Sequence, residues 1–306
     1  MPKFNLITIL GPTAVGKTKL AARLAKSFNG EIISADSRQV YKRMDIGTGK
    51  DLSEYKINGM NIKYHLIDFL EPSDEFNLYE FNKLFYQVFA QITCANKIPF
   101  LVGGTGLYLH SILGKYDLRK VSFDPEKYKA LEKVDIELLR NRLKEINPSL
   151  HNTTDLLIKD RIIRALIVAE ENAKPFALHK TEINSLNIGV FAEREILKER
   201  ITLRLKHRLE NGMIEEVEKL LKGGITIEKM EFFGLEYKFI ARFLNGKLNY
   251  NDMFQKLNSA IHAFAKRQMT WFRKMEREGI NIIWIEDPTF EKAYRIISEK
   301  YFEQNV

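Results

Sequence analysis

The chain has 306 residues, of which 45% are hydrophobic and 29% are charged, as is ordinary for a soluble globular protein of one elaborated domain or two. Its 48 basic and 40 acidic residues leave a formal charge of +8, which suits a polyanionic partner but also occurs on ordinary solvated surfaces. The single cysteine excludes an internal disulfide framework, and no apolar run approaches the roughly 18 residues that span a bilayer. With no signal-peptide pattern at the N-terminus, we expect a cytoplasmic protein.

The first hundred residues alternate short β-rich runs with amphipathic stretches. Strands are predicted at 4–10, at 31–37 and within 98–109, where a glycine turn closes the strand, and helices are predicted at 17–28 and 76–97. Gly30 is expected to end the first helix, and Cys94, late in the second, is expected to be a small core residue. Strands that alternate with helices in this way indicate a parallel α/β sheet.

Beyond about residue 115 the pattern becomes mostly helical. Charged amphipathic helices are predicted within 124–150 and 155–180, a strand at 187–193, a helical pair at 193–224 broken at Asn211-Gly212, a long helix at 251–279 and a last strand at 280–287. Asn251 or Asp252 is expected to cap the long helix. We therefore predict an α/β core formed by residues 1–117 and 191–306, with a mostly helical insertion at 118–190.

A glycine-rich loop, GPTAVGKT at 11–18, lies between the first predicted strand and the first predicted helix. In this context its backbone N–H groups and the helix N-terminus form a nest for an anion. Lys17 adds a positive charge to the bound phosphates, and the Thr18 hydroxyl is placed to coordinate Mg²⁺. A simple connecting turn would not account for both side chains. The loop therefore predicts a phosphate ligand without saying which molecule carries the phosphate.

Polar turns follow two further predicted strands. Asp36 lies at the C-terminal end of the strand at 31–37, where open α/β sheets place their ligands. Its carboxylate could act as a general base, hold a metal, or cap a helix. The strand that begins at residue 98 ends in Gly-Gly-Thr-Gly at 103–106, where many P-loop NTPases carry an acid that orients magnesium and ATP. The missing acid disfavours a standard NTPase.

Two helical stretches carry regularly spaced basic residues. Arg161 and Arg164 lie three positions apart, on one helix face. The long C-terminal helix interleaves basic with aromatic residues: Lys266, Arg267, Arg273 and Lys274 with Phe264, Trp271 and Phe272. This pattern suits phosphate contacts and base stacking in RNA. It is equally typical of an amphipathic helix that buries its aromatic residues and exposes a basic face.

Taken together and in order, these motifs resemble the tRNA dimethylallyltransferase family, the tRNA A37 isopentenyltransferases. The segments are GPTAVGKT (11–18), SADSRQVYKRMDIGTGK (34–50), YHLIDFLEPSDEFNLYEF (64–81), LVGGTGLY (101–108), RIIRAL (161–166) and KRQMTWFRK (266–274). The resemblance extends over nearly the whole chain. It implies a P-loop fold that does not use ATP but transfers the dimethylallyl group of dimethylallyl diphosphate, with Mg²⁺ required. The acceptor would be N6 of adenosine 37, 3′ of the anticodon, in tRNAs that read codons beginning with U.

The resemblance also implies roles for individual residues. The loop that holds the diphosphate would be Gly11, Pro12, Thr13, Ala14, Val15, Gly16, Lys17 and Thr18, with Arg267 as a further phosphate ligand. Asp36 would be the general base, and Thr105 would form a hydrogen bond near the flipped-out base. The residues that contact tRNA, at the anticodon stem-loop, would be Asp36, Ser37, Arg38, Gln39, Thr105, Lys127, Asp160, Arg161, Ile162, Ile163 and Arg164. The family precedent is a monomer.

Several positions depart from the family pattern. Ile158 stands where the family has Asp, and Asp160 directly precedes Arg161. Asp51 replaces a proline, and Lys127 or Tyr128 replaces an expected arginine. These differences fall mostly on segments expected to contact RNA, whereas the expected diphosphate site and base are intact.

Three other classes of protein would require different residues. An enzyme that prenylates free adenine nucleotides predicts a reduced insertion and no long basic C-terminal helix. A small-molecule kinase predicts the carboxylate that is missing after residue 102. A non-catalytic RNA-binding protein has no reason to combine Lys17, Thr18, Asp36 and Thr105.

Overall fold

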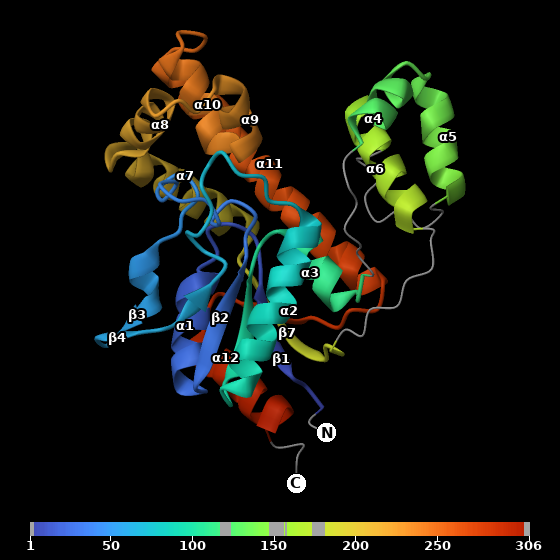
Figure 1. Cartoon of the computed structure of the whole chain (residues 1–306). Helices are drawn as coiled ribbons and strands as arrows, with labels where there is room; N and C mark the ends of the chain where they lie inside the picture. The colour runs from blue at the N-terminus through green and yellow to red at the C-terminus, as the bar shows by residue number, and fades with distance from the viewer. Residues whose placement is uncertain (1–2, 117–123, 147–155, 157, 173–180, 303–306) are drawn as a thin grey trace. The chain divides into compact units, whose positions relative to one another are not determined.

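The computed structural model describes residues 3–116, 124–146, 156, 158–172 and 181–302. The chain divides into two compact units, one formed by Met1–Tyr116 with Glu182–Val306 and the other by Asp117–Thr181. The first contains the main sheet and the second contains helices (Figure 1). The predicted insertion ended at residue 190, whereas Ser185–Phe191 forms a strand of the main sheet.

The main sheet has six parallel strands in the order β5-β2-β6-β1-β7-β8. The strands are β1 (Leu6–Leu10), β2 (Gly30–Ala35), β5 (Tyr64–His65), β6 (Ile98–Gly103), β7 (Ser185–Phe191) and β8 (Ile283–Glu286). A separate antiparallel pair is formed by β3 (Lys56–Ile57) and β4 (Met60–Asn61), just after a 3₁₀ turn at Leu52–Tyr55. The predicted parallel α/β fold is confirmed.

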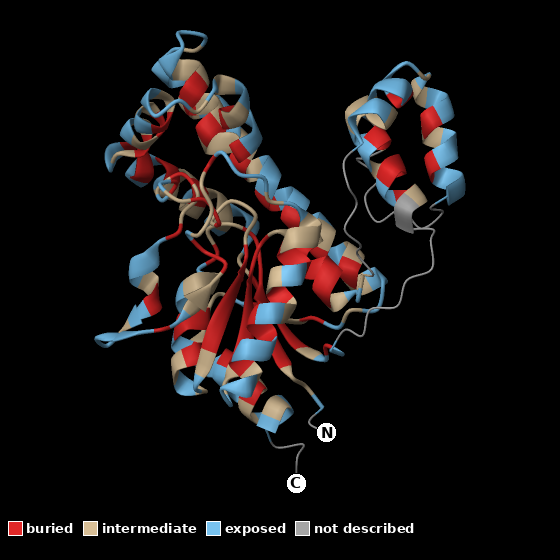
Figure 2. Ribbon diagram, viewed as in Figure 1, coloured by how far each residue is buried: buried red, intermediate tan, exposed pale blue. Residues whose placement is uncertain are grey.

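Helices cover both faces of the sheet because successive side chains of a strand point to opposite faces. Ile7 and Ile9 of β1 lie in the core beneath α1 (Lys17–Ser27) and α12 (Phe290–Ile297). Leu6 and Leu10 lie in the opposite core, with side chains from α2 (Leu78–Cys94), α3 (Gly106–Leu113) and the C-terminal part of α11 (Tyr250–Arg277). Figure 2 shows the resulting buried strands between partly exposed helices.

A third core lies among the C-terminal helices. It joins buried side chains of α7 (Arg194–Glu210), α8 (Met213–Lys222), α9 (Ile227–Phe233), α10 (Leu235–Leu244) and the N-terminal part of α11. Val40, Tyr41 and Met44, from the segment after β2, are part of this core. The predicted helical pair is confirmed as α7 and α8, separated by Gly212 with φ of 95°. The sequence pattern did not predict α9, α10 or α12, and it missed α3, which begins at Gly106 directly after the glycine turn that closes β6.

Three local predictions were wrong. Asn29 takes the left-handed conformation after α1, with φ of 51°, and Gly30 instead opens β2. Asn249 caps α11, because its side chain accepts a hydrogen bond from the Asp252 N–H at 2.8 Å. Cys94 is exposed because it is the last residue of α2 and lies off the stripe that faces the sheet.

The second unit is a small helical cluster built from α4 (Pro125–Glu132), α5 (Ile136–Ile146) and α6 (Lys159–Asn172). Its core is formed by leucine and isoleucine side chains, among them Leu139, Leu143, Ile162, Ile163 and Leu166. Across the described part of both units, every helix is too short or too polar to cross a bilayer.

Glu31 offers a test of how the N-terminal edge of the sheet is stabilised. Its side chain is 4% exposed and lies 2.7 Å from Lys97 Nζ, 2.7 Å from His65 Nε2 and 3.3 Å from Lys63 Nζ. Burial alone would raise the pKa of Glu31, but its hydrogen bonds with Lys97, His65 and Lys63 outweigh burial and lower the pKa to about 2. The carboxylate therefore stabilises the fold above pH 4.5, and this contribution is lost as the pH falls from 4.5 towards 2.

We expect Glu31→Gln to lower the free energy of unfolding by about 2–3 kcal/mol at pH 7 and by much less near pH 3. Urea unfolding at both pH values measures the difference. Glu182→Gln is the matched control, since Glu182 pairs with Lys115 on the exposed surface and should change stability little. An equal loss for Glu31→Gln at both pH values would contradict the prediction.

Candidate active site

The glycine-rich loop joins β1 to α1 and adopts the backbone expected of an anion nest. Ala14 and Gly16 have φ of 65° and 85°, and Gly16 immediately precedes α1. Alternation between right-handed and left-handed residues turns successive N–H groups toward one concave side of a loop. Lys17 folds back over the loop and donates to the Pro12 carbonyl at 3.2 Å.

A second cation reaches the same loop from α7. The Arg204 guanidinium donates to the Thr13 hydroxyl. Burial and the nearby Arg204 charge lower the pKa of Lys17 to about 8, while Asp36 and Glu54 oppose this shift. Burial and Arg208 likewise lower the pKa of Arg204 to about 10. Because two desolvated cations repel each other, the loop is poised to be stabilised by a polyanion.

Arg204 was not predicted as a site residue. The sequence nevertheless indicates it, because Arg204 and Arg208 lie four residues apart on α7, on either side of the buried Leu205. Arginines on the inward face of a helix indicate an ion pair or an anionic ligand. The Arg208 guanidinium lies 3.4 Å from Asp51, at the position where the family pattern has a proline.

Gln268 of α11 links the glycine-rich loop to the Gly-Gly-Thr turn after β6. Its Oε1 accepts from the Thr13 N–H at 2.9 Å, and its Nε2 donates to the Gly104 carbonyl at 2.8 Å. The side chain is buried, and a Cβ at position 104 would collide with its amide. Gln268 was not predicted as a site residue.

The residue predicted at this point of α11 was Arg267. Arg267 is exposed, with its guanidinium 5.8 Å from the Phe264 ring centroid. Its role as a phosphate ligand stays a prediction. The neighbouring Phe272 is fully buried and Arg273 is exposed, so this stretch of α11 has the amphipathic arrangement that the sequence left open.

Asp36 and Thr105 come together because β2 and β6 are adjacent parallel strands that end at the same edge. Ala35 is opposite Gly103 in the register, and the Thr105 N–H donates to the Ala35 carbonyl at 3.2 Å. The Thr105 hydroxyl then accepts from the Ser37 N–H at 3.2 Å. The two turns thus form one polar surface beside the glycine-rich loop.

The Asp36 carboxylate also supports its own turn. Its Oδ1 accepts from the N–H groups of Arg38 at 2.9 Å and Gln39 at 3.4 Å. Asp36 therefore does cap the backbone that follows it, as one of the sequence-based alternatives proposed, although the capped segment is a turn and not a helix. Oδ2 forms no hydrogen bond with any residue in the described ranges and is left to act on a ligand.

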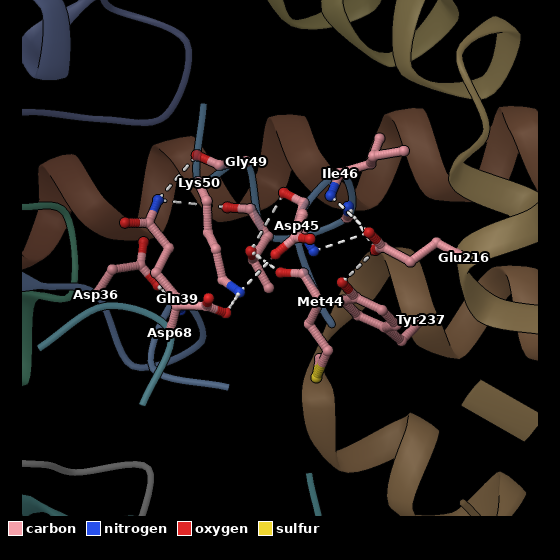
Figure 3. Close-up of polar contacts among 12 residues, drawn as sticks. Asp36, Gln39, Met44, Asp45, Ile46, Gly49, Lys50, Asp68, Glu216 and Tyr237 are labelled. Carbon is pink, nitrogen blue, oxygen red and sulfur yellow. Dashed lines mark hydrogen bonds and ion pairs between the residues drawn. The ribbon is translucent and has the colours of Figure 1, made fainter. Parts of the chain in front are cut away.

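Arg38 and Gln39, predicted to contact RNA, are held in place by the protein itself. The Arg38 guanidinium lies 4.5 Å from the Phe232 ring centroid, and burial lowers its pKa. The Gln39 Nε2 donates to the Gly49 carbonyl at 2.9 Å (Figure 3).

In the helical unit, two predicted RNA contacts are wrong at the level of side chains. Ile162 and Ile163 are fully buried in the core of that unit, since they lie on the inward face of α6. Arg161 and Arg164 are exposed on the same helix and remain candidates. Asp160 accepts from the Tyr128 hydroxyl at 2.6 Å and from Arg164 Nε at 3.1 Å, while Lys127 pairs with Glu170 at 2.8 Å. RNA contacts by these polar side chains stay predictions.

The metal site predicted at Thr18 has few protein donors. The Thr18 hydroxyl lies in the first turn of α1, beside Lys17. Within the described ranges, His, Cys, Asp and Glu side chains form no group of three or more that could hold a metal ion. Such a site suits Mg²⁺, which usually takes one or two protein oxygens and completes its shell with phosphate and water.

The fold and this site define a P-loop protein with a cationic anion-binding nest after β1 and a carboxylate at the end of β2, which is separated from β1 in the sheet by β6. A family model described as IPP transferase matches residues 39–275, and a model described as isopentenyl transferase matches residues 4–67. The chain belongs to the IPP transferase family.

Similar proteins cover almost the whole chain. A protein named tRNA dimethylallyltransferase 1 from Geotalea uraniireducens is 52% identical over 92% of each chain. One named tRNA dimethylallyltransferase 2 from Pelobacter propionicus is 50% identical over 98% of this chain and 96% of its own. The crystal structure of a full-length tRNA isopentenylpyrophosphate transferase from Bacillus halodurans matches with a TM-score of 0.72, at 32% identity and 98% coverage of both chains.

Proposed function

We propose that this protein is a tRNA dimethylallyltransferase that prenylates N6 of adenosine 37, in tRNAs that read codons beginning with U. The observation that carries the proposal is that the cationic nest after β1 lies close to the Asp36 carboxylate at the end of β2, with β6 between the two strands. Lys17 and Asp36 are close enough for the Asp36 charge to act on the pKa of Lys17. A site of this kind can hold a diphosphate and accept a proton within the same small volume.

The charges around the loop fit an allylic diphosphate as the substrate. As the bond between the allylic carbon and oxygen breaks, negative charge grows on the departing diphosphate, and Lys17, Arg204 and the backbone nest neutralise it. Mg²⁺ held by the Thr18 hydroxyl and diphosphate oxygens would supply further charge neutralisation.

The acceptor is an exocyclic amine, which is a weak nucleophile because its lone pair is delocalised into the purine ring. A carboxylate that takes the N6 proton as the new carbon–nitrogen bond forms would help, and Asp36 Oδ2 is available for it. Thr105, on the adjoining turn, is placed to orient the flipped-out base. Atoms and charge balance, since the products are prenylated adenosine, diphosphate and a proton on Asp36.

The extent of the resemblance favours tRNA over a free nucleotide as the acceptor. The chain keeps a helical insertion at α4–α6 and a long α11, both of which a free-nucleotide enzyme was expected to reduce or lack. Exposed Arg161 and Arg164 on α6 suit an anticodon stem through phosphate contacts. A monomeric state and a cytoplasmic location remain predictions.

The experiment is to incubate the purified protein with Mg²⁺, dimethylallyl diphosphate and an unmodified anticodon stem-loop that contains A-A-A at positions 36–38. Mass spectrometry of the digested RNA should show addition of one five-carbon unit to adenosine. Addition to AMP but not to the stem-loop would assign the free-nucleotide reaction. Consumption of ATP without prenylation would assign a kinase.

Lys17 predicts a pH dependence for the use of dimethylallyl diphosphate. In the free site the pKa of Lys17 is about 8. Of the two forms of Lys17, only the charged ammonium attracts the diphosphate. We therefore expect kcat/KM to fall about tenfold per pH unit above this value, whereas kcat at saturation holds to higher pH because bound diphosphate favours the charged form.

Steady-state rates between pH 6.5 and 9 measure this dependence, below the pH at which Arg204 loses its charge. In Lys17→Arg the guanidinium stays charged over the whole range, so the decline above pH 8 should disappear whatever the absolute activity. A decline that persists unchanged in Lys17→Arg would assign the titration to another group.

A further inference from the structure

A turn that has no part in the proposed mechanism is linked by hydrogen bonds to the segment that holds Asp36, the candidate base. Residues 45–49, here called the 45–49 turn, belong to the segment between β2 and the 3₁₀ turn at Leu52–Tyr55. Figure 3 shows the side chain of Glu216, from the first part of α8, extending to this turn rather than to its own helix. The two segments are about 170 residues apart in the chain.

The Glu216 carboxylate holds three consecutive backbone N–H groups of the turn. Its Oε2 accepts from Asp45 at 2.8 Å and Ile46 at 2.7 Å, and its Oε1 accepts from Gly47 at 3.0 Å. A fourth hydrogen bond comes from the Tyr237 hydroxyl to Oε1 at 2.7 Å. Charge-assisted hydrogen bonds of this kind are roughly twice as strong as neutral ones, and four of them define the position of the turn closely.

The packing of Tyr237 makes the arrangement rigid. Tyr237 is almost fully buried, and its ring fills the space where position 47 would carry a Cβ. Any larger residue at Gly47 would push the turn away from α10. Burial, followed by the nearby Glu216 carboxylate, raises the pKa of the Tyr237 hydroxyl, so it stays protonated and donates to Glu216.

The other end of the turn leads to the candidate base through one side chain. The Gln39 Nε2 donates to the carbonyls of Gly49 at 2.9 Å and Thr48 at 3.5 Å. The Gln39 backbone N–H lies 3.4 Å from Asp36 Oδ1 and donates to it. The position of the turn therefore sets the position of Gln39, and Gln39 helps to set the orientation of the Asp36 carboxylate.

We propose that Glu216 is a positioning residue of the transfer reaction, which acts on Asp36 through the 45–49 turn and Gln39. This inference rests on the proposed function, because it takes Asp36 as the base. Dimethylallyl diphosphate is held by the glycine-rich loop, which Glu216 does not touch. Loss of Glu216 should consequently affect the chemical step and leave the affinity for the diphosphate substrate unchanged.

The test uses Glu216→Gln, which keeps the shape of the side chain but turns an amide NH₂ toward N–H donors. We expect kcat to fall about tenfold or more, since a misplacement of about 1 Å can reduce a rate 10²-fold, while KM for dimethylallyl diphosphate stays within twofold. Glu218→Gln is the matched control, because Glu218 lies on the same helix and pairs with exposed Lys222 at 2.8 Å. Its kcat should equal that of the wild type.

A double-mutant cycle separates positioning from a general structural role. If Glu216 acts through Asp36, then Glu216→Gln should have almost no effect on the residual rate when Asp36→Asn is already present. A full additional loss in that background would overturn the inference, as would a KM for dimethylallyl diphosphate that rises as much as kcat falls.

Tyr237→Phe keeps the inference testable if Glu216→Gln does not fold. It removes one of the four hydrogen bonds and no charge, and we expect kcat about threefold below the wild type with KM unchanged. A kcat equal to that of the wild type would count against the inference. Wild-type protein that transfers no dimethylallyl group would refute the proposed function itself, whereas an active wild type with unaffected variants would refute only the role of Glu216.

Discussion

Replacing Asp36 by Asn should reduce turnover about 10²- to 10⁴-fold, the range that a general base contributes, while the protein stays folded and binds RNA. The structure explains why Asn is the informative substitution. Asp36 Oδ1 accepts hydrogen bonds from the N–H groups of Arg38 and Gln39, and an Asn carbonyl oxygen can accept the same two. Asn therefore preserves the turn and removes only the ability to take a proton from N6.

Single-turnover rates with the anticodon stem-loop, together with filter binding of the same RNA, measure the two properties separately. Asp36→Ala is the comparison, since it removes both the base and the acceptor for the turn. We expect Asp36→Ala to lose at least as much activity as Asp36→Asn, with some loss of stability. If Asp36→Asn weakens RNA binding by the same factor as turnover, Asp36 supports the structure and is not the base.

Replacing Lys50 by Met should lower the free energy of unfolding by about 2–3 kcal/mol. The Lys50 side chain is fully buried, and its ammonium lies 2.6 Å from Asp45 and 2.5 Å from Asp68. Met fills nearly the same volume but leaves the two carboxylates facing each other without a cation. The expected loss stays below that of a fully buried pair because both aspartates are about half exposed and keep water as a partner.

Urea unfolding at pH 7 measures this loss. The matched control is Lys42→Met, because Lys42 also pairs with a carboxylate, Glu71 at 3.0 Å, but both side chains are about half exposed. The control should change stability by less than about 1 kcal/mol. Equal losses for the two variants would show that burial adds nothing to the Lys50 pair.

Much of the fold followed from local pattern. The strands β1, β2 and β6, the helices α1 and α2, and the α7–α8 pair were predictable because hydrophobic periodicity and glycine breaks are local properties. The ends of helices were less predictable. Asn29 ends α1 and Asn249 caps α11, whereas the pattern assigned these roles to nearby residues. Cys94 and the pair Ile162 and Ile163 show that burial depends on which way a helix faces, which is decided by its partners.

The sequence by itself determined the family, the glycine-rich loop and the candidate base, because a phosphate nest is formed by consecutive residues and Asp36 directly follows a strand. Only the tertiary structure decided what surrounds them. Arg204 and Gln268 reach Thr13 from 191 and 255 residues away, and Glu216 reaches the 45–49 turn across a comparable distance. The order of the strands and the packing of α7, α8 and α11 bring these side chains to the site, and no local pattern encodes that order.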